Sequence, residues 1–207
     1  MFQFTSKPLK IAISISLALA FTLLAISFVY TREVVFLWFN LNLGKVADQI
    51  FTFFTLLAEG WMWIPYFLLM FGWFKKDAVF ILINFLLSTL LTQVPKILIL
   101  DNVTRPMASG IDVNKIHHVD GIEMHLWNSF PSGHTATAFT LYFVTVTLFP
   151  KKWILIIGFI YALTCAYSRV YLGQHFPLDL GGGILVAIMS VLLSIYIRKN
   201  IRNEKVI

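Results

Sequence analysis

Residues 11–30 read IAISISLALAFTLLAISFVY, twenty consecutive residues without a charge. A helix needs about 20 apolar residues to cross the hydrocarbon core of a membrane, so this stretch decides the fold class. The whole chain has the same character, since 58% of its 207 residues are hydrophobic and 13% are charged. A soluble globular domain carries about 25% charged residues. The sequence therefore predicts an all-α integral membrane protein whose first segment is an uncleaved anchor.

Five more apolar runs follow, and together they predict one membrane-embedded domain, residues 1–207, with six transmembrane helices. The interrupted apolar segment 33–54 after the first span predicts a helix that lies at the interface or packs on the bundle. The predicted spans are Ile11–Tyr30, Leu56–Phe74, Ala78–Leu100, Thr135–Phe149, Trp153–Tyr171 and Leu178–Ile197.

Basic residues are grouped at alternate ends of these spans. The groups are Lys7 and Lys10; Lys75 and Lys76; Lys151 and Lys152; and Arg198, Lys199, Arg202 and Lys205. With six spans, all four groups lie on one side, which the positive-inside rule makes cytoplasmic. The net charge of +6 is then a topology signal and not a sign of nucleic-acid binding. Both termini are expected in the cytoplasm, and the compact chain favours a bacterial inner membrane.

Three polar segments meet on the opposite, outer side. They are PKILILDNVTRP at 95–106, FPSGH at 130–134 and SRVYLGQHFPLD at 168–179. Ionisable groups at membrane depth are costly and mark functional sites. Each has a structural explanation when taken singly, such as a snorkelling arginine or a helix N-cap. Those explanations do not account for seven such residues on one face: Lys96, Arg105, Ser132, His134, Arg169, His175 and Asp179.

The chemistry of this set points to phosphate. The segment Pro131–His134 begins a predicted helix, and the first amides of a helix have no intrahelical partner and bind anions. Gly133 lets an anion approach the backbone closely, and lysine and arginine side chains suit an oxyanion. Asp179, in the first turn of the last span, can accept a hydrogen bond from His175 Nδ1 and leave Nε2 free to attack.

At this point two motifs resemble those of the type 2 phosphatidic acid phosphatase family, which shares a fold with vanadium haloperoxidases. PSGH at 131–134 is one, and SRVYLGQHFPLD at 168–179 fits the spacing SR-x5-H-x3-D. The family's first motif is K-x6-RP, whereas here eight residues separate Lys96 from Arg105-Pro106. The resemblance covers residues 95–185 and agrees with the six-span plan.

The resemblance implies a mechanism and a set of roles. His175 attacks phosphorus and forms a phosphohistidine, supported by Asp179. His134 protonates the leaving oxygen and then activates water. No metal or cofactor is required. The phosphoryl oxygens are held by Lys96, Arg105, Ser132, the Gly133 amide and Arg169.

Two other patterns have competing interpretations. The loop before PSGH contains metal-ligand residue types, but their spacing matches no fixed metal motif, so a solvated loop over the site is favoured. Gly181–Gly183 resembles a phosphate loop, but close helix packing explains it better. The loop residues concerned are His117, His118, Asp120, Glu123 and His125.

The sequence thus predicts an integral-membrane lipid phosphate phosphatase. Its partners are a lipid phosphate substrate and membrane lipids, with no obligate protein partner. A lipid-to-lipid phosphotransferase with the same site is an alternative, and a transporter or scaffold with a silent site is a third. The substrate stays open among undecaprenyl diphosphate, phosphatidylglycerol phosphate, phosphatidic acid and lipid A.

Overall fold

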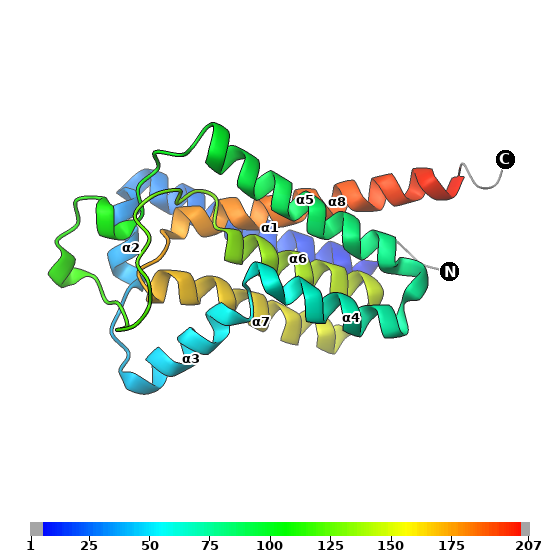
Figure 1. The fold of residues 1–207 in the computed structure, drawn as a ribbon, viewed down its shortest axis with the longest axis horizontal. Helices are drawn as coiled ribbons and strands as arrows, with labels where there is room; N and C mark the ends of the chain where they lie inside the picture. The colour runs from blue at the N-terminus through cyan, green and yellow to red at the C-terminus, as the bar shows by residue number, and fades with distance from the viewer. Residues whose placement is uncertain (1–5, 204–207) are drawn as a thin grey trace.

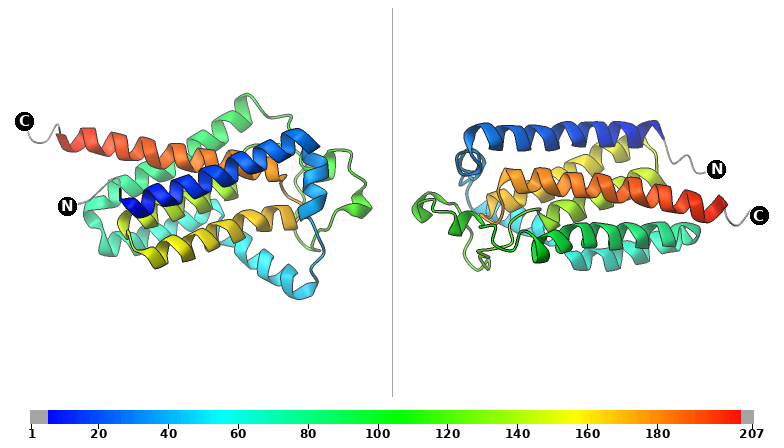
Figure 2. Two further views of the ribbon diagram at one scale, coloured as in Figure 1. Left: turned by 180° about the vertical axis from the view of Figure 1, so that it is seen from behind. Right: turned by 90° about the horizontal axis from the view of Figure 1, so that it is seen from above.

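The computed structural model describes residues 6–203, and all regular structure in that range is helical. The long helices run side by side, and loops and short helices cover one end of the bundle (Figures 1 and 2). The α-helices are α1 Lys7–Tyr30, α2 Arg32–Phe39, α3 Lys45–Leu56, α4 Trp63–Trp73, α5 Ala78–Leu98, α6 Gly133–Leu148, α7 Lys152–Tyr171 and α8 Pro177–Asn203. Short 3₁₀ helices are η1 Gly60–Met62, η2 Lys75–Asp77, η3 Pro106–Ala108 and η4 Val113–Lys115.

Four stretches are long and apolar enough to cross a membrane alone: α1, η2 with α5, α7, and α8 as far as Ile201. Helix α3 and the segment Gly60–Trp73 together form a fifth candidate, bent by 58°. The predicted all-helical membrane fold is therefore confirmed, with four or five candidate spans. Helix α6 has 16 residues and is about 24 Å long, shorter than the hydrocarbon core of about 30 Å.

The predicted span Leu56–Phe74 differs from the structure in its first half. Only Trp63–Trp73 is α-helical, and the chain bends between α3 and η1. Pro65 explains the break, because a proline ring clashes with the carbonyl four residues earlier in a continuous helix. It is tolerated here because it lies in the first turn of α4.

The predicted single helix after the first span is two helices, α2 and α3. The chain between them turns at Gly44, whose φ of +84° favours glycine. The amide of Gly44 donates to Asn42 Oδ1 at 2.9 Å, which closes this turn. Helix α3 points away from the bundle axis at the loop-covered end (Figure 1).

Helix α6 occupies the centre of the bundle. It packs against α8, α7 and α5, and α8 packs in turn against α1. All but three of its sixteen residues are buried. A helix surrounded by protein does not have to match the thickness of the lipid, which permits its short length.

The glycine run in α8 allows this close packing. A Cβ atom added at Gly182 would lie 2.4 Å from the ring of Phe130, and one at Gly183 would lie 2.6 Å from the carbonyl oxygen of Ser132. The packing interpretation of Gly181–Gly183 is therefore confirmed.

We expect Gly182→Ala to destabilise the protein by about 1–3 kcal/mol, the usual cost of overpacking. The matched control is Gly72→Ala in α4, where an added Cβ would have no heavy atom within 4 Å. Thermal unfolding in detergent should show a lower midpoint for the Gly182 variant alone. Equal midpoints for the two variants would contradict the packing argument.

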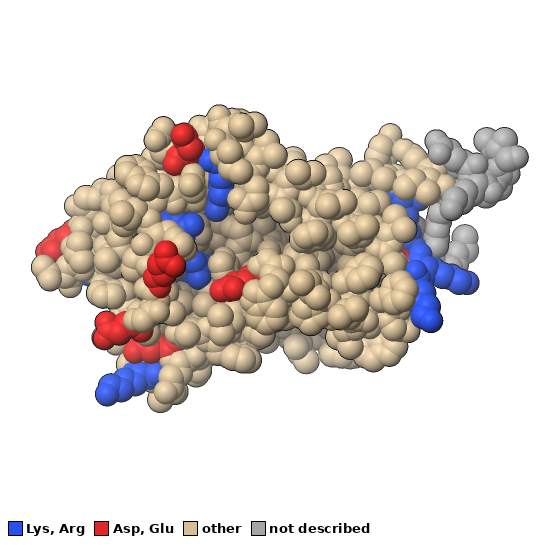
Figure 3. Space-filling model, in the orientation of Figure 1, with Lys and Arg blue, Asp and Glu red and all other residues tan. Residues whose placement is uncertain are grey.

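The basic groups lie together at the end opposite the loops. The first residues of α1, the last of α8 and the α4–α5 and α6–α7 turns meet there (Figure 1), and Lys and Arg side chains gather on that end (Figure 3). Lys205 and the side chain of Arg202 lie outside the described part of the chain. Arg198 is buried, pairs with Asp77 and lies over the ring of Phe80, so it differs from the exposed lysines of the other groups.

Candidate active site

The turn that carries His175 is built by the end of α7. Gly173 has φ +68°, and its amide donates to the Val170 carbonyl at 3.0 Å. The amide of Gln174 donates to the Arg169 carbonyl at 2.8 Å. These two bonds form a Schellman motif, in which a glycine in the left-handed region ends a helix. The sequence RVYLGQH therefore folds back on itself and places His175 between α7 and α8.

Asp179 holds His175 in place from the first turn of α8. Its Oδ2 atom accepts hydrogen bonds from the Phe176 amide at 2.9 Å and the Ser129 hydroxyl at 2.5 Å, and it lies 3.2 Å from His175 Nδ1. Because a carboxylate accepts, Nδ1 carries the proton and Nε2 keeps its lone pair. The predicted pairing of His175 with Asp179 is thus present in the structure. Ser129, which the sequence did not single out, is a third member.

We expect Ser129→Ala to lower kcat by about 10–100-fold, since a hydrogen bond to a charged group contributes about 1.5–3 kcal/mol. KM should change little, because Ser129 orients His175 only through Asp179. Ser129→Thr keeps a hydroxyl and should restore part of the rate. The control is Ser109→Ala, whose hydroxyl donates to the Pro106 carbonyl in the outer loop. A change in KM with unchanged kcat would refute this positioning role.

Two arginines reach the site from different elements. Arg169, in the last turn of α7, donates to Thr55 Oγ1 at 2.5 Å, and its buried Nε has no hydrogen-bond partner among the described residues. Arg105, in the loop after α5, donates to the Trp127 carbonyl at 2.9 Å and to Gln174 at 3.3 Å. Burial lowers the pKa of Arg105, and the charge of nearby Asp179 opposes this shift. Both remain cations suited to an oxyanion.

Lys96 lies in the last turn of α5 and is 7% exposed. Helix α5 ends at Leu98, so most of the residues between Lys96 and Arg105 belong to a turn and loop. Two residues added to a continuous helix would rotate Arg105 by about 200° around the helix axis relative to Lys96. Because the added residues lie in a turn and loop, this rotation does not occur here. Arg105 is held in this loop by its own amide, which donates to the Leu126 carbonyl at 2.8 Å.

The start of α6 presents backbone amides and His134. Ser132 caps the helix by accepting from the Thr135 amide at 3.4 Å, and its own amide donates to the Asp179 carbonyl at 3.0 Å. The amides of Gly133 and His134 come first in the helix, where no intrahelical carbonyl can accept from them. His134 Nε2 is buried without a hydrogen-bond partner among residues 6–203.

The charges of several of these groups act on His175. Burial lowers the pKa of His175 well below its usual range, and neighbouring positive charges lower this pKa further. The side chain is therefore a neutral imidazole at neutral pH, which is the nucleophilic form. The groups whose charges act on it are Arg105, Lys96, Arg169 and His134.

The structure also shows supporting residues that sequence reasoning missed. Asn40 Nδ2 donates to the carbonyls of Val170, Tyr171 and His117 at 2.8–3.0 Å and so ties the end of α7 to the outer loop. Arg32 lies over the ring of Phe176 at 4.6 Å and donates to Thr104 Oγ1 at 2.9 Å. Such contacts join segments far apart in the sequence, so no local pattern marks them.

The histidine-rich loop is only partly solvated. Glu123 and His125 have exposed side chains, whereas His117 Nε2 lies 3.1 Å from Asp48 Oδ1. The same Asp48 oxygen accepts from the Tyr171 hydroxyl at 2.6 Å. His117 therefore connects the loop to α3 and α7. Within residues 6–203, no three His, Cys, Asp or Glu side chains are grouped to hold a metal ion.

A cavity of about 390 Å³ adjoins His134 and Gly133, between the start of α6, α5 and the bend before α4. Polar side chains of α5 line it, among them Thr92 and Gln93. A second cavity of about 330 Å³ is almost wholly apolar and lies between α4 and α5. The two share three lining residues: Gly60, Trp63 and Phe85. A polar chamber beside His134 thus adjoins an apolar groove.

Two known phosphatases are similar to this chain in sequence. The chain is 31% identical over 161 residues to the undecaprenyl-diphosphatase of Sulfolobus acidocaldarius, covering 76% of this chain and 74% of the relative. It is 42% identical over 57 residues to the lipid A 4′-phosphatase of Bacteroides thetaiotaomicron, which is 28% of this chain and 25% of that protein.

Two solved structures have a similar fold. The fold superposes on Aquifex aeolicus LpxE with a TM-score of 0.66 at 31% identity, covering 78% of this chain and 92% of that one. It superposes on the PAP2-type phosphatidylglycerolphosphate phosphatase of Bacillus subtilis with a TM-score of 0.65 at 25% identity, covering 94% and 97%. Residues 77–203 match the PAP2 superfamily. The predicted family and the predicted class of enzyme, a phosphatase, are therefore confirmed, and the chain belongs to the PAP2 superfamily.

Proposed function

We propose that this protein removes a phosphoryl group from a lipid phosphate or diphosphate through a phosphohistidine intermediate. The observation that carries the proposal is the Asp179–His175 contact of 3.2 Å in a setting of buried cations. It supplies a neutral, oriented nucleophile where a phosphate would be held. The unpartnered Nε of Arg169 and Nε2 of His134 are the donors such an anion needs.

The reaction has two displacements. His175 Nε2 attacks phosphorus, a P–N bond forms, the P–O bond to the lipid breaks, and His134 gives its proton to the departing oxygen. Water then attacks the phosphohistidine while His134 takes a proton from it, and the P–N bond breaks to release phosphate. Cations and the first amides of α6 stabilise the charge on the phosphoryl oxygens in both steps.

The lipid reaches this site from the membrane. The chamber beside His134 adjoins the apolar groove between α4 and α5, and this groove suits a hydrocarbon chain attached to a phosphate. A polyprenyl diphosphate is the first substrate to test, because an undecaprenyl-diphosphatase is among the relatives that match most of the chain.

The test is phosphate release by purified protein in detergent with EDTA, using undecaprenyl diphosphate, phosphatidylglycerol phosphate, phosphatidic acid and lipid A. At least one should release free phosphate, and vanadate should inhibit, since it adopts the five-coordinate geometry of phosphoryl transfer. Transfer to a second lipid with no free phosphate would identify a phosphotransferase. Unchanged lipids would support a silent site, and activity restored only by a metal would refute metal-independent hydrolysis.

We further propose six membrane crossings, by α1, the bent pair α3–α4, α5, α6, α7 and α8, with α3 starting at the interface. The basic groups at one end support a cytoplasmic location for that end and an outer location for His175. A bacterial inner membrane suits this arrangement. Both termini would then be cytoplasmic.

Sidedness is tested with a cysteine at Asn114, an exposed residue of the outer loop, after replacing the buried Cys165. An impermeant maleimide should label this variant in intact cells. A cysteine at the exposed Lys152, at the other end of the bundle, should react only after the cells are broken. The reverse pattern would overturn the proposed topology.

A further inference from the structure

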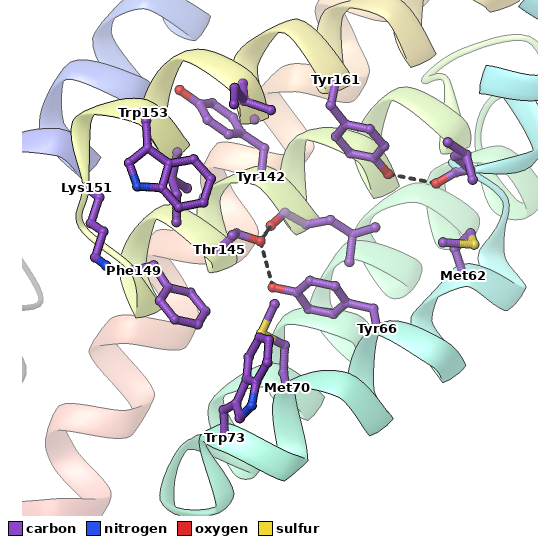
Figure 4. Close-up of a pocket in the computed structure, with 15 residues that line it drawn as sticks. Met62, Tyr66, Met70, Trp73, Tyr142, Thr145, Phe149, Lys151, Trp153 and Tyr161 are labelled. Atoms are coloured by element: carbon purple, nitrogen blue, oxygen red, sulfur yellow. Dashed lines mark hydrogen bonds between the residues drawn. The ribbon is translucent and has the colours of Figure 1, made fainter.

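A separate cavity of about 650 Å³ lies between α4, α6 and α7. We call it the α4–α7 cavity and show it in Figure 4. Neither His134 nor Gly133 lines it, so it is distinct from the chamber at the active site. Its far end is formed by Met62 and Tyr161, and the end nearer the α6–α7 turn by Phe149, Lys151 and Trp153 (Figure 4).

The wall of this cavity offers hydrocarbon and little else, because its hydroxyl groups are already engaged. Tyr66 Oη lies 3.0 Å from Thr145 Oγ1, which itself donates to the Leu141 carbonyl at 2.7 Å. The Tyr161 hydroxyl donates to the Leu57 carbonyl at 2.7 Å. A polar ligand would therefore find few hydrogen-bond partners, whereas an apolar chain would leave no hydroxyl group of the wall unpaired.

The end of the cavity near the α6–α7 turn carries a charge and two tryptophans. Lys151 is the one charged residue among those that line it, and it is exposed in the α6–α7 turn. Trp73 and Trp153 also line the cavity and are 68% and 58% exposed. Tryptophan is enriched where a membrane meets water, and a lysine there attracts anionic head groups.

The depth of the cavity fits one leaflet. It extends along α7 from Lys151 to Tyr161, ten residues or about 15 Å of helix. The hydrocarbon core of a bilayer is about 30 Å thick. A chain that enters beside Lys151 would thus end near the middle of the membrane. The occupant therefore belongs to the leaflet at the basic end, the end opposite His175.

We propose that the α4–α7 cavity binds one hydrocarbon chain of an anionic membrane lipid whose head group lies against Lys151. This lipid is not the substrate, because its phosphate lies at the basic end of the bundle and His175 lies at the other end. It fills the space between α4 and α7 and links α4, which is short and lies on the outside of the bundle, to the central helices.

The test is native mass spectrometry of the full chain, delipidated and titrated with phosphatidylglycerol or phosphatidylcholine of identical chains. Phosphatidylglycerol is a phosphodiester, so it is not a substrate for the proposed phosphatase. One lysine near a head group predicts about five-fold tighter binding of the anionic lipid. Lys151→Gln should abolish this preference, while Lys152→Gln, one residue away and outside the cavity lining, should keep it.

A second pair of variants tests the chain site. Ile157 lines the cavity and Ile156 does not, yet they are 58% and 60% exposed. Ile157→Trp should fill the space and weaken binding of both lipids several-fold, and Ile156→Trp should not. Equal effects of the two lysine variants, or unchanged binding by a folded Ile157→Trp, would overturn the proposal. If Ile157→Trp unfolds at a lower temperature than the unmodified protein, the comparison of Lys151→Gln with Lys152→Gln tests the proposal alone, since both lysines are exposed.

Discussion

His175→Ala is expected to release no phosphate from any ester, whether a lipid phosphate or the reactive nitrophenyl phosphate. The reason is that this residue is proposed to form the bond to phosphorus, so a better leaving group cannot replace it. A loss of about 10⁴-fold or more is expected, as for other covalent nucleophiles. Rapid-quench measurements should detect neither a burst of nitrophenol nor a phosphorylated protein.

The controls separate chemistry from folding. His118→Ala removes an exposed histidine of the outer loop and should leave the rate unchanged. The His175 variant should still bind vanadate weakly through the surrounding cations and keep a near-normal unfolding midpoint. If it formed a phosphorylated intermediate at the normal rate, the nucleophile would have to be another residue.

The positions of most helices could be predicted from the sequence because each is a long apolar run. The predicted span Trp153–Tyr171 and helix α7, for example, differ by one residue at the start. The break before α4 was missed because Gly60 and Pro65 interrupt a run that stays apolar on both sides. Hydropathy measures how well residues dissolve in lipid, and it is insensitive to a bend.

The contact between His175 and Asp179 could be predicted from the sequence, and the contacts that support this pair could not. His175 lies just before α8 and Asp179 in its first turn, four residues later, so their spacing predicts the contact. Ser129 reaches the same carboxylate across fifty residues, and Thr55 meets Arg169 across 114. These contacts depend on how α3 and the outer loop pack on α7 and α8. No periodic pattern in either segment encodes them.

The loop histidines illustrate the same limit. A solvated loop was predicted, and Glu123 and His125 are indeed exposed. His117 instead contacts Asp48 on α3, because Asn40 accepts the His117 amide at 2.7 Å and draws this part of the loop inward. The available signal was Asn40, a polar residue in an apolar, interrupted segment. Its role in holding the loop can be recognised once α2 and α3 are known to be separate helices.

His134→Ala should damage catalysis in proportion to how much the leaving group needs a proton. A lipid alkoxide is a poor leaving group, and general acid catalysis is worth about 10²–10⁴-fold. Nitrophenolate leaves without help. The variant should therefore lose about 10²–10⁴-fold on a lipid phosphate and much less on nitrophenyl phosphate. The measurement is the first step, seen as the burst of nitrophenol.

The second step gives an independent result. Because His134 is also proposed to activate water, the phosphohistidine of the variant should accumulate after the burst. This bond is acid-labile and alkali-stable, which distinguishes it from a phosphate on Ser132. His134→Gln can donate a hydrogen bond but cannot exchange a proton, so it should behave like the alanine variant. If His134→Ala abolished the burst with nitrophenyl phosphate while His175→Ala kept it, the two histidines would have the opposite roles.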